Sequence, residues 1–375
     1  DPDEVQLRYL NVTENSATIK WFLPMDDDLD YLQVVCNGVT QKLAGNAITV
    51  TIEGLKPNTT YPLSIQCFDL AGNNSQKSQI TIDTAHTGSD WLFIYNANDL
   101  NAVRGGQAGY DNWGLGKNYQ VMVDIDLAGE GYANWQPIVG NFTGKLFGNG
   151  REVVAYEIEE VSTGGAAFFM VVAANLSEIR DLTIKVTQLT TIYATGTAIL
   201  VQKNSGTISN CHVAGSIECI ARAGGLVSDN TGAIIDCSAE VDIAVTIYGG
   251  PSNVSYGGLV ATNNGSILRS YAKNINIIAE QPDAGGVGGL VGQQTVAGAT
   301  INQCYAIGYV SCGISGVTNG AVGGLVGTMS NSSIDNCYTA VTVKGEGASS
   351  GSQAGGIVGS ATTGSVTNCY AVGSI

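Results

Sequence analysis

The chain has 375 residues, of which 50 are glycine and only 13% are charged, and its formal net charge is −16. This composition predicts many short strands joined by turns and argues against a mainly helical protein. No basic run is present, which argues against nucleic acids and anionic membranes as partners. No apolar run is long enough to span a membrane, and residues 1–375 contain no signal peptide. Because the first residue is Asp and not Met, we expect a mature or trimmed exported chain that does not insert into membranes.

Residues 1–86 contain short runs of alternating apolar residues separated by Gly, Pro and Asn. This pattern predicts an antiparallel β-sandwich. The segment 54–61 ends in Tyr61, whose hydroxyl we expect to return to nearby backbone at a corner between strands. Together with Trp21, this segment resembles a fibronectin type III module. The resemblance implies a spacer or binding unit in an extracellular setting.

Two polar features of this first domain have alternative interpretations. Asp26, Asp27, Asp28 and Asp30 could form a cation site, but we favour a solvated acidic loop and expect no metal. Cys36 and Cys67 lie on different predicted strands. A disulfide between them is possible by this placement, although we favour two free thiols.

Residues 90–145 are interpreted as a cap that covers the first coil of the array that follows, because an open end would expose a core and unpaired strand edges. The sequence predicts a short helix over 97–103 and a strand over 119–127. Trp135 is assigned to the core of the cap. In a loop rich in Gly and Asn, Tyr110 and Trp113 are candidate exposed aromatic residues for ligand binding.

Within the predicted cap strand, Asp124 and Asp126 would share one face and resemble a carboxylate pair for acid–base chemistry. No other catalytic residue type accompanies them in the surrounding sequence. We therefore do not expect them to be catalytic.

Residues 146–375 repeat a motif centred on Gly-Gly-Leu-Val, with steps of 25 to 35 residues between equivalent apolar positions. These positions are Leu146, Val171, Leu200, Leu226, Leu259, Leu290, Leu325 and Ile357. A second apolar position follows in most copies, at Ile179, Ile208, Ile234, Ile267, Ile301, Ile334 and Val366. Steps of this size without helical periodicity predict a right-handed parallel β-helix with two or three strands in each turn. The glycine pairs would allow tight corners.

A polar residue follows two positions after the second apolar position, at Asn210, Asp236, Gln303, Asn336 and Asn368. Asn tolerates a left-handed backbone, so we predict a corner there. Such a corner would turn the next residue inward. That residue is cysteine in five copies, which we interpret as buried free thiols instead of a disulfide framework: Cys211, Cys237, Cys304, Cys337 and Cys369.

The residue after each of these cysteines or its equivalent would then point outward, and in four consecutive copies it is tyrosine: Tyr271, Tyr305, Tyr338 and Tyr370. Stacked amphipathic rings could grip an extracellular glycan or a surface protein of the host or of bacteria. The alternative, which we favour, is that the rings stack on one another and only cover the wall.

The repeats, with Gly-Gly-Leu-Val-Gly in two copies and one Gly-Gly-Ile-Val-Gly variant, resemble the bacterial GLUG-motif family over about residues 90–375. The copies at Leu226 and Leu259 lack the closing glycine. This resemblance implies a bacterial cell-surface protein, since the family includes adhesin-like proteins and accessory regions of immunoglobulin-A-cleaving metallopeptidases. We expect an extracellular protein, with a removed N-terminal leader as one means of lipid anchoring.

The sequence contains two histidines and no H-E-x-x-H motif, phosphate-binding loop or dinucleotide-binding motif, so we expect neither an enzyme nor a cofactor. We favour a surface protein for adhesion or binding. The alternative is a β-helical polysaccharide lyase or glycoside hydrolase, which would need charged side chains clustered on one wall. The group that lies on neighbouring turns is Arg222, Glu240, Asp242, Arg269 and Lys273.

Overall fold

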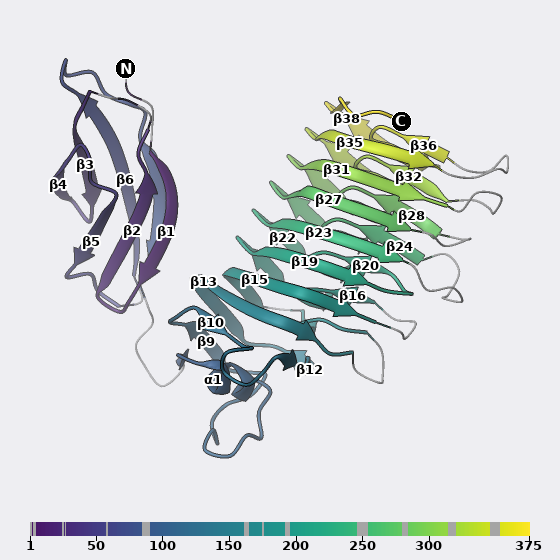
Figure 1. Ribbon diagram of the computed structural model, residues 1–375, viewed down its shortest axis with the longest axis horizontal. Coiled ribbons are helices and arrows are strands. Elements are labelled where there is room, and N and C mark those ends of the chain that lie inside the picture. The colour runs from purple at the N-terminus through teal and green to yellow at the C-terminus, as the bar shows by residue number, and fades with distance from the viewer. Residues whose placement is uncertain are drawn as a thin grey trace. The chain divides into compact units, whose positions relative to one another are not determined.

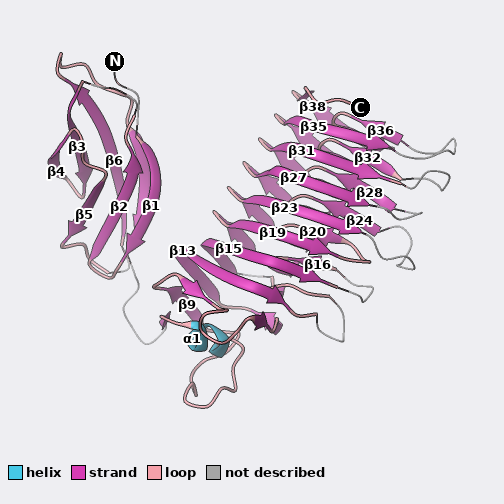
Figure 2. Ribbon diagram, viewed as in Figure 1, coloured by secondary structure: helices cyan, strands magenta, loops and turns pink. Residues whose placement is uncertain are grey.

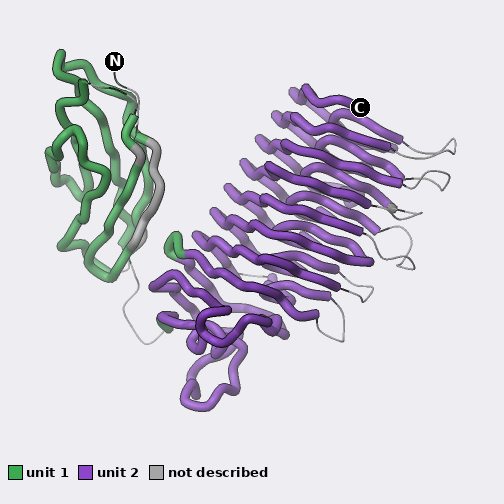
Figure 3. Tube along the Cα trace, in the orientation of Figure 1, with its two compact units in different colours: residues 1–93, 149–151 green, residues 94–148, 152–375 purple. Residues whose placement is uncertain are grey.

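The computed structural model describes residues 2, 5–24, 26, 28–57, 59–84, 91–160, 165–174, 176–191, 196–245, 254–279, 284–313, 320–345 and 353–375. These residues form strands and one short helix, which confirms the predicted all-β class (Figure 2). The chain divides into two compact units (Figure 3). The first comprises Asp1–Phe93 with Asn149–Arg151, and the second comprises Ile94–Gly148 with Glu152–Ile375. The described residues include no helix with the length and hydrophobicity that crossing a membrane requires.

The first unit is a sandwich of two antiparallel sheets (Figure 1), as the alternating apolar pattern predicts. One sheet has the order β1–β2–β5, and its strands are β1 (Gln6–Val12), β2 (Ser16–Phe22) and β5 (Thr49–Glu53). The other has the order β4–β3–β6–β7, and its strands are β3 (Leu29–Cys36), β4 (Val39–Ala44), β6 (Thr60–Asp69) and β7 (Ser78–Asp83). The inward-facing side chains of both sheets form one hydrophobic core.

Two aromatic residues anchor this core in the predicted way. Trp21 is buried, and its Nε1–H donates to the carbonyl oxygen of Ala47 at 2.9 Å. The hydroxyl of Tyr61 accepts a hydrogen bond from the backbone N–H of Lys56 at 2.9 Å, which is the expected tyrosine corner.

The polar features of the first unit have simple structural roles. Cys36 and Cys67 are both buried and free. On the paired strands β3 and β6, Cys36 lies opposite Leu63 and not opposite Cys67, so the disulfide alternative is wrong. Asp30 lies on β3, and its carboxylate is 4.0 Å from the Lys42 ammonium. Asp27 lies outside the described residues.

Strand β8 (Trp91–Ile94) spans the boundary between the two units. The second unit then continues with short elements that lead into the solenoid: α1 (Ala97–Ala102), β9 (Asn118–Val121), β10 (Ile125–Asp126) and β11 (Asn134–Trp135). The helix is capped by Asn96, whose side chain accepts from the N–H of Asp99 at 2.9 Å. Strands β9, β10 and β11 all pair in parallel with β13 (Lys145–Ile158). The strand expected over 119–127 is interrupted after Val121 and resumes at Ile125.

The solenoid consists of parallel sheets whose strands come from successive turns of the chain (Figure 1). The first sheet contains β12 (Ile138–Phe142), β14 (Phe169–Val172), β17 (Val201–Asn204), β21 (Val227–Asn230), β25 (Val260–Asn263), β29 (Val291–Gln294), β33 (Val326–Met329) and β37 (Val358–Ala361). The second contains β16 (Thr197–Ala198), β20 (Ala223–Gly224), β24 (Val254–Gly257), β28 (Ala284–Gly288), β32 (Ala321–Gly323) and β36 (Gln353–Gly355).

The third sheet is bent at a corner, so most turns contribute two strands to it. After β13 and β15 (Glu178–Thr190), the paired contributions are β18 (Thr207–Ser209) with β19 (His212–Glu218), β22 (Ala233–Ile235) with β23 (Ser238–Val245), β26 (Ser266–Leu268) with β27 (Tyr271–Ala279), β30 (Thr300–Asn302) with β31 (Tyr305–Cys312), β34 (Ser332–Asp335) with β35 (Tyr338–Gly345), and β38 (Gly364–Thr367) with β39 (Tyr370–Ala371).

Equivalent residues of successive turns lie directly above one another, as the repeat predicts. The second apolar position pairs in register from turn to turn, for example Ile234 with Ile267 and Ile301 with Ile334. These isoleucines are buried. A single turn could not bury such a face, so stacking supplies the core.

The bend in the third sheet is a left-handed corner. Its residues have φ between 46° and 55°, and they are Asp181, Asn210, Asp236, Arg269, Gln303, Asn336 and Asn368. The corner was predicted at five of these positions and also occurs at Asp181 and Arg269. It resets the alternation of the strand, so the following residue points inward.

The glycine pairs form the corner between the second and first sheets, but the reason differs from the expected backbone freedom. Gly288 and Gly289 do not have positive φ. A Cβ on Gly289 would instead collide with the carbonyl oxygen of Gly324 on the next turn, and one on Gly288 would collide with the carbonyl of Val291. The motif therefore requires glycine because the turns approach too closely for a side chain.

Candidate binding surface

A stack of tyrosines runs along the outer wall of the solenoid, just after the left-handed corner. Its ring centroids are separated by 4.6 Å between Tyr271 and Tyr305, 4.9 Å between Tyr305 and Tyr338, and 5.4 Å between Tyr338 and Tyr370. The ring planes differ by 4°, 11° and 10°. The rings therefore cover each other's faces and present their edges to solvent. We call these four residues the tyrosine stack.

The rings stack on one another, as the favoured interpretation predicts, and the side chains are still accessible, so ligand binding stays a prediction. Tyr271, Tyr305 and Tyr338 are half-buried, and Tyr370 is 58% exposed. Burial, and then the neighbouring phenols, raise the pKa of Tyr305 to about 12. Its hydroxyl therefore stays protonated at neutral pH and can donate a hydrogen bond to a ligand.

The cysteines behind the tyrosine stack fix the corner from inside. The five cysteines predicted to point inward are all free, and four of them are buried as predicted, whereas Cys369 in the last described turn is partly exposed. The thiol of Cys337 donates to the carbonyl oxygen of Asp335 at 3.1 Å. Its contact with the Cys304 thiol and its burial raise the pKa of Cys337, so this sulfur stays protonated. These cysteines are part of the scaffold that turns each tyrosine outward.

Charged side chains beside the tyrosine stack are neutralised in pairs. Lys273 lies 3.1 Å from the carboxylate of Glu240, which raises the pKa of the lysine. Burial would raise the pKa of Glu240, but hydrogen bonds from Asn274 and Lys273 outweigh it and lower this pKa. In the two turns that precede the tyrosine stack, His212 and Ser238 occupy the equivalent positions. Nδ1 of His212 lies 2.7 Å from the hydroxyl of Ser238. This part of the wall is therefore polar, with its opposite charges paired.

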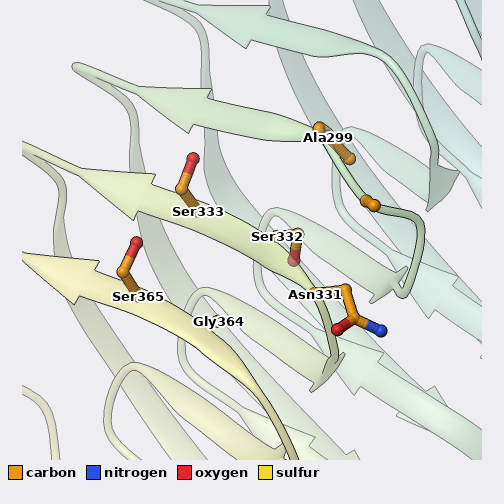
Figure 4. Close-up of a pocket in the computed structure, with 8 residues that line it drawn as sticks. Ala299, Asn331, Ser332, Ser333, Gly364 and Ser365 are labelled. Carbon is orange, nitrogen blue, oxygen red and sulfur yellow. The ribbon is translucent and has the colours of Figure 1, made fainter.

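A shallow groove lies on the other side of the corner, in the last turns of the solenoid (Figure 4). Its volume is about 480 Å³, and it is lined by Ala297, Gly298, Ala299, Asn331, Ser332, Ser333, Gly364 and Ser365. Figure 4 shows the hydroxyls of Ser333 and Ser365 side by side on neighbouring strands, with that of Ser332 turned to the other side. Small residues leave room here, and hydroxyl and amide groups supply polar contacts.

This groove was not predicted from the sequence. A signal was present, because the position before the second apolar residue recurs as a hydroxyl at Thr207, Ser266, Thr300, Ser333 and Ser365. Registered strands place Thr300, Ser333 and Ser365 in one outward column. The depth of the groove could not be predicted, since it depends on how the turn at 297–299 stacks against Asn331 and Gly364.

The charged group considered for a lyase or hydrolase is divided among separate ion pairs. The guanidinium of Arg222 lies 2.7 Å from Asp229, beside the second and first sheets. Arg269 donates two hydrogen bonds of 2.7 Å to the carboxylate of Asp236 on the left-handed corner. Asp242 is exposed on β23. The basic groups are therefore engaged in separate ion pairs, and Arg222 lies on other sheets than Arg269.

The aromatic and acidic candidates of the cap have structural partners. The Tyr110 hydroxyl donates to the carboxylate of Asp99 at 2.8 Å, and its ring packs edge-on against Trp113 at 5.1 Å. Both rings are half-buried. Trp135 is buried and stacks on Phe168 with centroids 4.7 Å apart, as expected for a core residue.

Asp124 accepts the backbone N–H of Glu152, and Asp126 accepts that of Gly129, each at 3.0 Å. These two carboxylates therefore brace the backbone. Among the residues that the structure describes, no three His, Cys, Asp or Glu side chains gather in a way that could hold a metal ion.

Family comparison identifies a fibronectin type III domain over residues 1–84 and the GLUG motif over residues 318–344 and 350–375. These matches confirm both resemblances drawn from the sequence. None of the curated proteins compared with this chain matches it.

Among solved structures, IgA1 protease is similar over 98% of this chain and 29% of its own, with a TM-score of 0.52 and 16% identity, and this likeness concerns the fold alone. The Clostridium perfringens spore cortex lytic enzyme SleM is 23% identical over 22% of this chain and 28% of its own, with a TM-score of 0.21. Chitinase ChiA74 from Bacillus thuringiensis is 26% identical over 23% of this chain and 14% of its own, with a TM-score of 0.19. The chain therefore spans less than a third of each of these three proteins.

Proposed function

We propose that this chain is a non-enzymatic binding module of a bacterial surface protein, whose solenoid presents its outer wall to an extracellular glycan or protein. One observation carries the proposal: four tyrosines on successive turns form a continuous line at the surface, with accessible ring edges. Amphipathic aromatic side chains of this kind are enriched at recognition surfaces. The fibronectin type III domain and the GLUG motifs fit a surface or binding protein.

The competing function is cleavage of a polysaccharide. A lyase or hydrolase needs acidic or basic groups that converge on one bond of the substrate. Arg222, Arg269 and Lys273 are each paired with a different carboxylate, so that each of these charges is already neutralised. The Arg222–Asp229 pair lies beside the second and first sheets, whereas the other two pairs lie on the third sheet. We therefore favour binding over catalysis.

The binding proposal is tested with arrays of glycans and of extracellular proteins, probed with the whole chain and with Tyr305→Ala and Tyr338→Ala. Ligands retained by the wild-type protein should bind each variant at least about fivefold more weakly, which corresponds to the roughly 1 kcal/mol that separates a significant contact from a neutral one. Tyr156→Ala is the matched control, because Tyr156 is 56% exposed on β13 of the same unit, away from the tyrosine stack. Equal binding by all four proteins would exclude the tyrosine stack as the binding surface.

Catalysis is tested on the same polysaccharides by measuring new reducing ends and new unsaturated sugar ends. No cleavage is expected. Cleavage by the wild-type chain that Arg269→Ala or Lys273→Ala abolishes would overturn the non-enzymatic proposal.

A further inference from the structure

We propose that the tyrosine stack is a site of oxidative modification, at which a haem peroxidase acting with hydrogen peroxide couples tyrosines of successive turns into dityrosine. This inference does not depend on the binding function. It rests on the spacing, orientation and accessibility of the four rings and on the chemistry of phenols.

The spacing brings equivalent atoms of two phenols close together. Tyr271, Tyr305 and Tyr338 pair in register on neighbouring parallel strands, and Tyr338 pairs with Tyr370. Centroids lie 4.6 to 5.4 Å apart with nearly parallel planes. The ring carbons next to each hydroxyl therefore face their counterparts on the adjacent turn. Accessible side chains change rotamer within nanoseconds, so a small tilt can bring two of these carbons into contact.

The chemistry balances with the named oxidant. Each phenol loses one electron to the peroxidase and its hydroxyl proton to water, which gives a phenoxyl radical. Two radicals then join through the carbons next to their oxygens, forming one C–C bond. Each of these carbons gives up its hydrogen as a proton, and each oxygen regains one from water, which restores both aromatic rings. In total, two electrons and two protons reduce one hydrogen peroxide to two waters.

The thiols compete little with the accessible phenols for the oxidant. Eight of the nine cysteines are buried, and Cys369 is only partly exposed. Peroxide reacts with thiolates, and burial raises the pKa of Cys211 and of Cys312, which keeps them protonated. Among the described residues, the ring contacts between two tyrosines all lie in the tyrosine stack. Coupling within one chain should therefore concentrate there.

The positions of Lys and Arg make the coupling directly readable by mass spectrometry after trypsin digestion. Tyr271 is released in the peptide 270–273, Tyr305 and Tyr338 remain together in 274–344, and Tyr370 is released in 345–375. After dilute protein is treated with peroxidase and hydrogen peroxide, we expect peptide 274–344 to be joined to 270–273 and to 345–375. Each joined pair should weigh two hydrogen atoms less than its parts.

Two conservative variants control for each other, because each keeps an aromatic ring in the stack and removes one phenol. Tyr305→Phe should abolish the link to 270–273 and keep the link to 345–375. Tyr338→Phe should do the reverse. Urea-unfolded wild-type protein should lose most of both links, since the register of the turns is then lost.

Three results would overturn the proposal. The first is the absence of both links while free tyrosine in the same reaction is converted to dityrosine. The second is a link that persists in the variant lacking its phenol. The third is coupling whose yield falls in proportion to dilution and appears only as covalent dimers, which would show that it occurs between chains.

Discussion

The backbone N–H of Cys304 donates a hydrogen bond to the sulfur of Cys337 on the next turn, at 3.3 Å. The same contact joins Cys211 to Cys237 at 3.4 Å. In the one turn where serine replaces cysteine, the N–H of Cys237 donates to the hydroxyl of Ser270 at 3.0 Å. Each thiol or hydroxyl thus satisfies a buried N–H that follows the left-handed corner.

Substitutions of Cys337 distinguish two roles of its side chain, which are accepting this hydrogen bond and filling space in the core. Cys337→Ser should change the free energy of unfolding by less than about 1 kcal/mol, because Ser270 already performs the same role. Cys337→Ala should cost about 1–3 kcal/mol, since it leaves the Cys304 N–H buried without a partner. Urea denaturation of the three proteins measures both. Equal losses in the two variants would mean that the sulfur acts only through its volume.

The repeat motif requires glycine because there is no space for a side chain. Adding a single methyl group should therefore lower the stability of the fold strongly. Gly289→Ala would place a Cβ against the carbonyl oxygen of Gly324, and backbone cannot move aside cheaply. We expect a loss of at least about 2–3 kcal/mol, or insoluble protein. The matched control is Gly345→Ala, whose Cβ would meet its nearest neighbour at 3.6 Å. A comparable thermal unfolding temperature for both variants would contradict this explanation.

A buried amide ladder runs inside the solenoid and carries the third prediction. Asn204 donates to Asn230 at 2.8 Å, Asn230 donates to Asn263 at 2.8 Å, and Asn263 donates to Gln294 at 2.7 Å. Asn230 and Asn263 each accept from the amide of one neighbouring turn and donate to that of the other. The chain of contacts therefore depends on every member having an N–H and a carbonyl oxygen.

Asn230→Asp keeps the shape and removes the donor to Asn263. We expect a loss of about 3 kcal/mol or more at neutral pH, because an ionised carboxylate would be fully buried. Burial raises the pKa of such a carboxyl, so the loss should shrink as the pH falls towards 4, where the neutral acid can donate again. Unfolding measured from pH 8 to pH 4, with wild type as the reference, tests this. A loss that does not change with pH would show that the amide donor is not what matters.

Structural features that recur in every turn could be predicted from the sequence more readily than features that occur once. The inward cysteines and the outward tyrosines follow from one corner that recurs in each turn, and both positions were predicted. Arg269 was not predicted at the corner, because arginine has no intrinsic preference for a positive φ, which here is 46°. Its conformation is imposed by the turns on either side.

Features that depend on contact between turns were less predictable. The ladder at Asn204, Asn230 and Asn263 has a sequence signal, since asparagine follows three residues after a buried valine in three successive turns. Nothing in the pattern showed that the amides point inward. The groove beside Ser333 and Ser365 depends on the turn at 297–299, in the connection between β29 and β30. This connection has five residues, whereas the equivalent connections from β17 to β18 and from β33 to β34 have two.

The final prediction concerns the pH dependence of stability and follows from His212, which occupies the equivalent position two turns before Tyr271 of the tyrosine stack. Burial is the main cause that lowers the pKa of this histidine, and Lys273 adds to it, while Asp181 and Glu240 act in the opposite direction. The folded protein therefore binds a proton at His212 less readily than the unfolded chain does. Stability should be greatest above about pH 6.5, the usual value for histidine, and should fall as the pH is lowered through the depressed value.

His212→Gln removes this titration and keeps a polar side chain beside Ser238, whose hydroxyl lies 2.7 Å from the histidine ring. We expect the wild-type protein to be the more stable of the two at pH 8, with the difference in the free energy of unfolding narrowing as the pH falls from about 6.5 to 5. Carboxylates titrate in both proteins and cancel in this comparison. Urea denaturation at several pH values provides the measurement. A constant difference across this range would mean that His212 keeps an ordinary pKa in the folded protein, and a widening one would mean that the carboxylates of Asp181 and Glu240 dominate its surroundings.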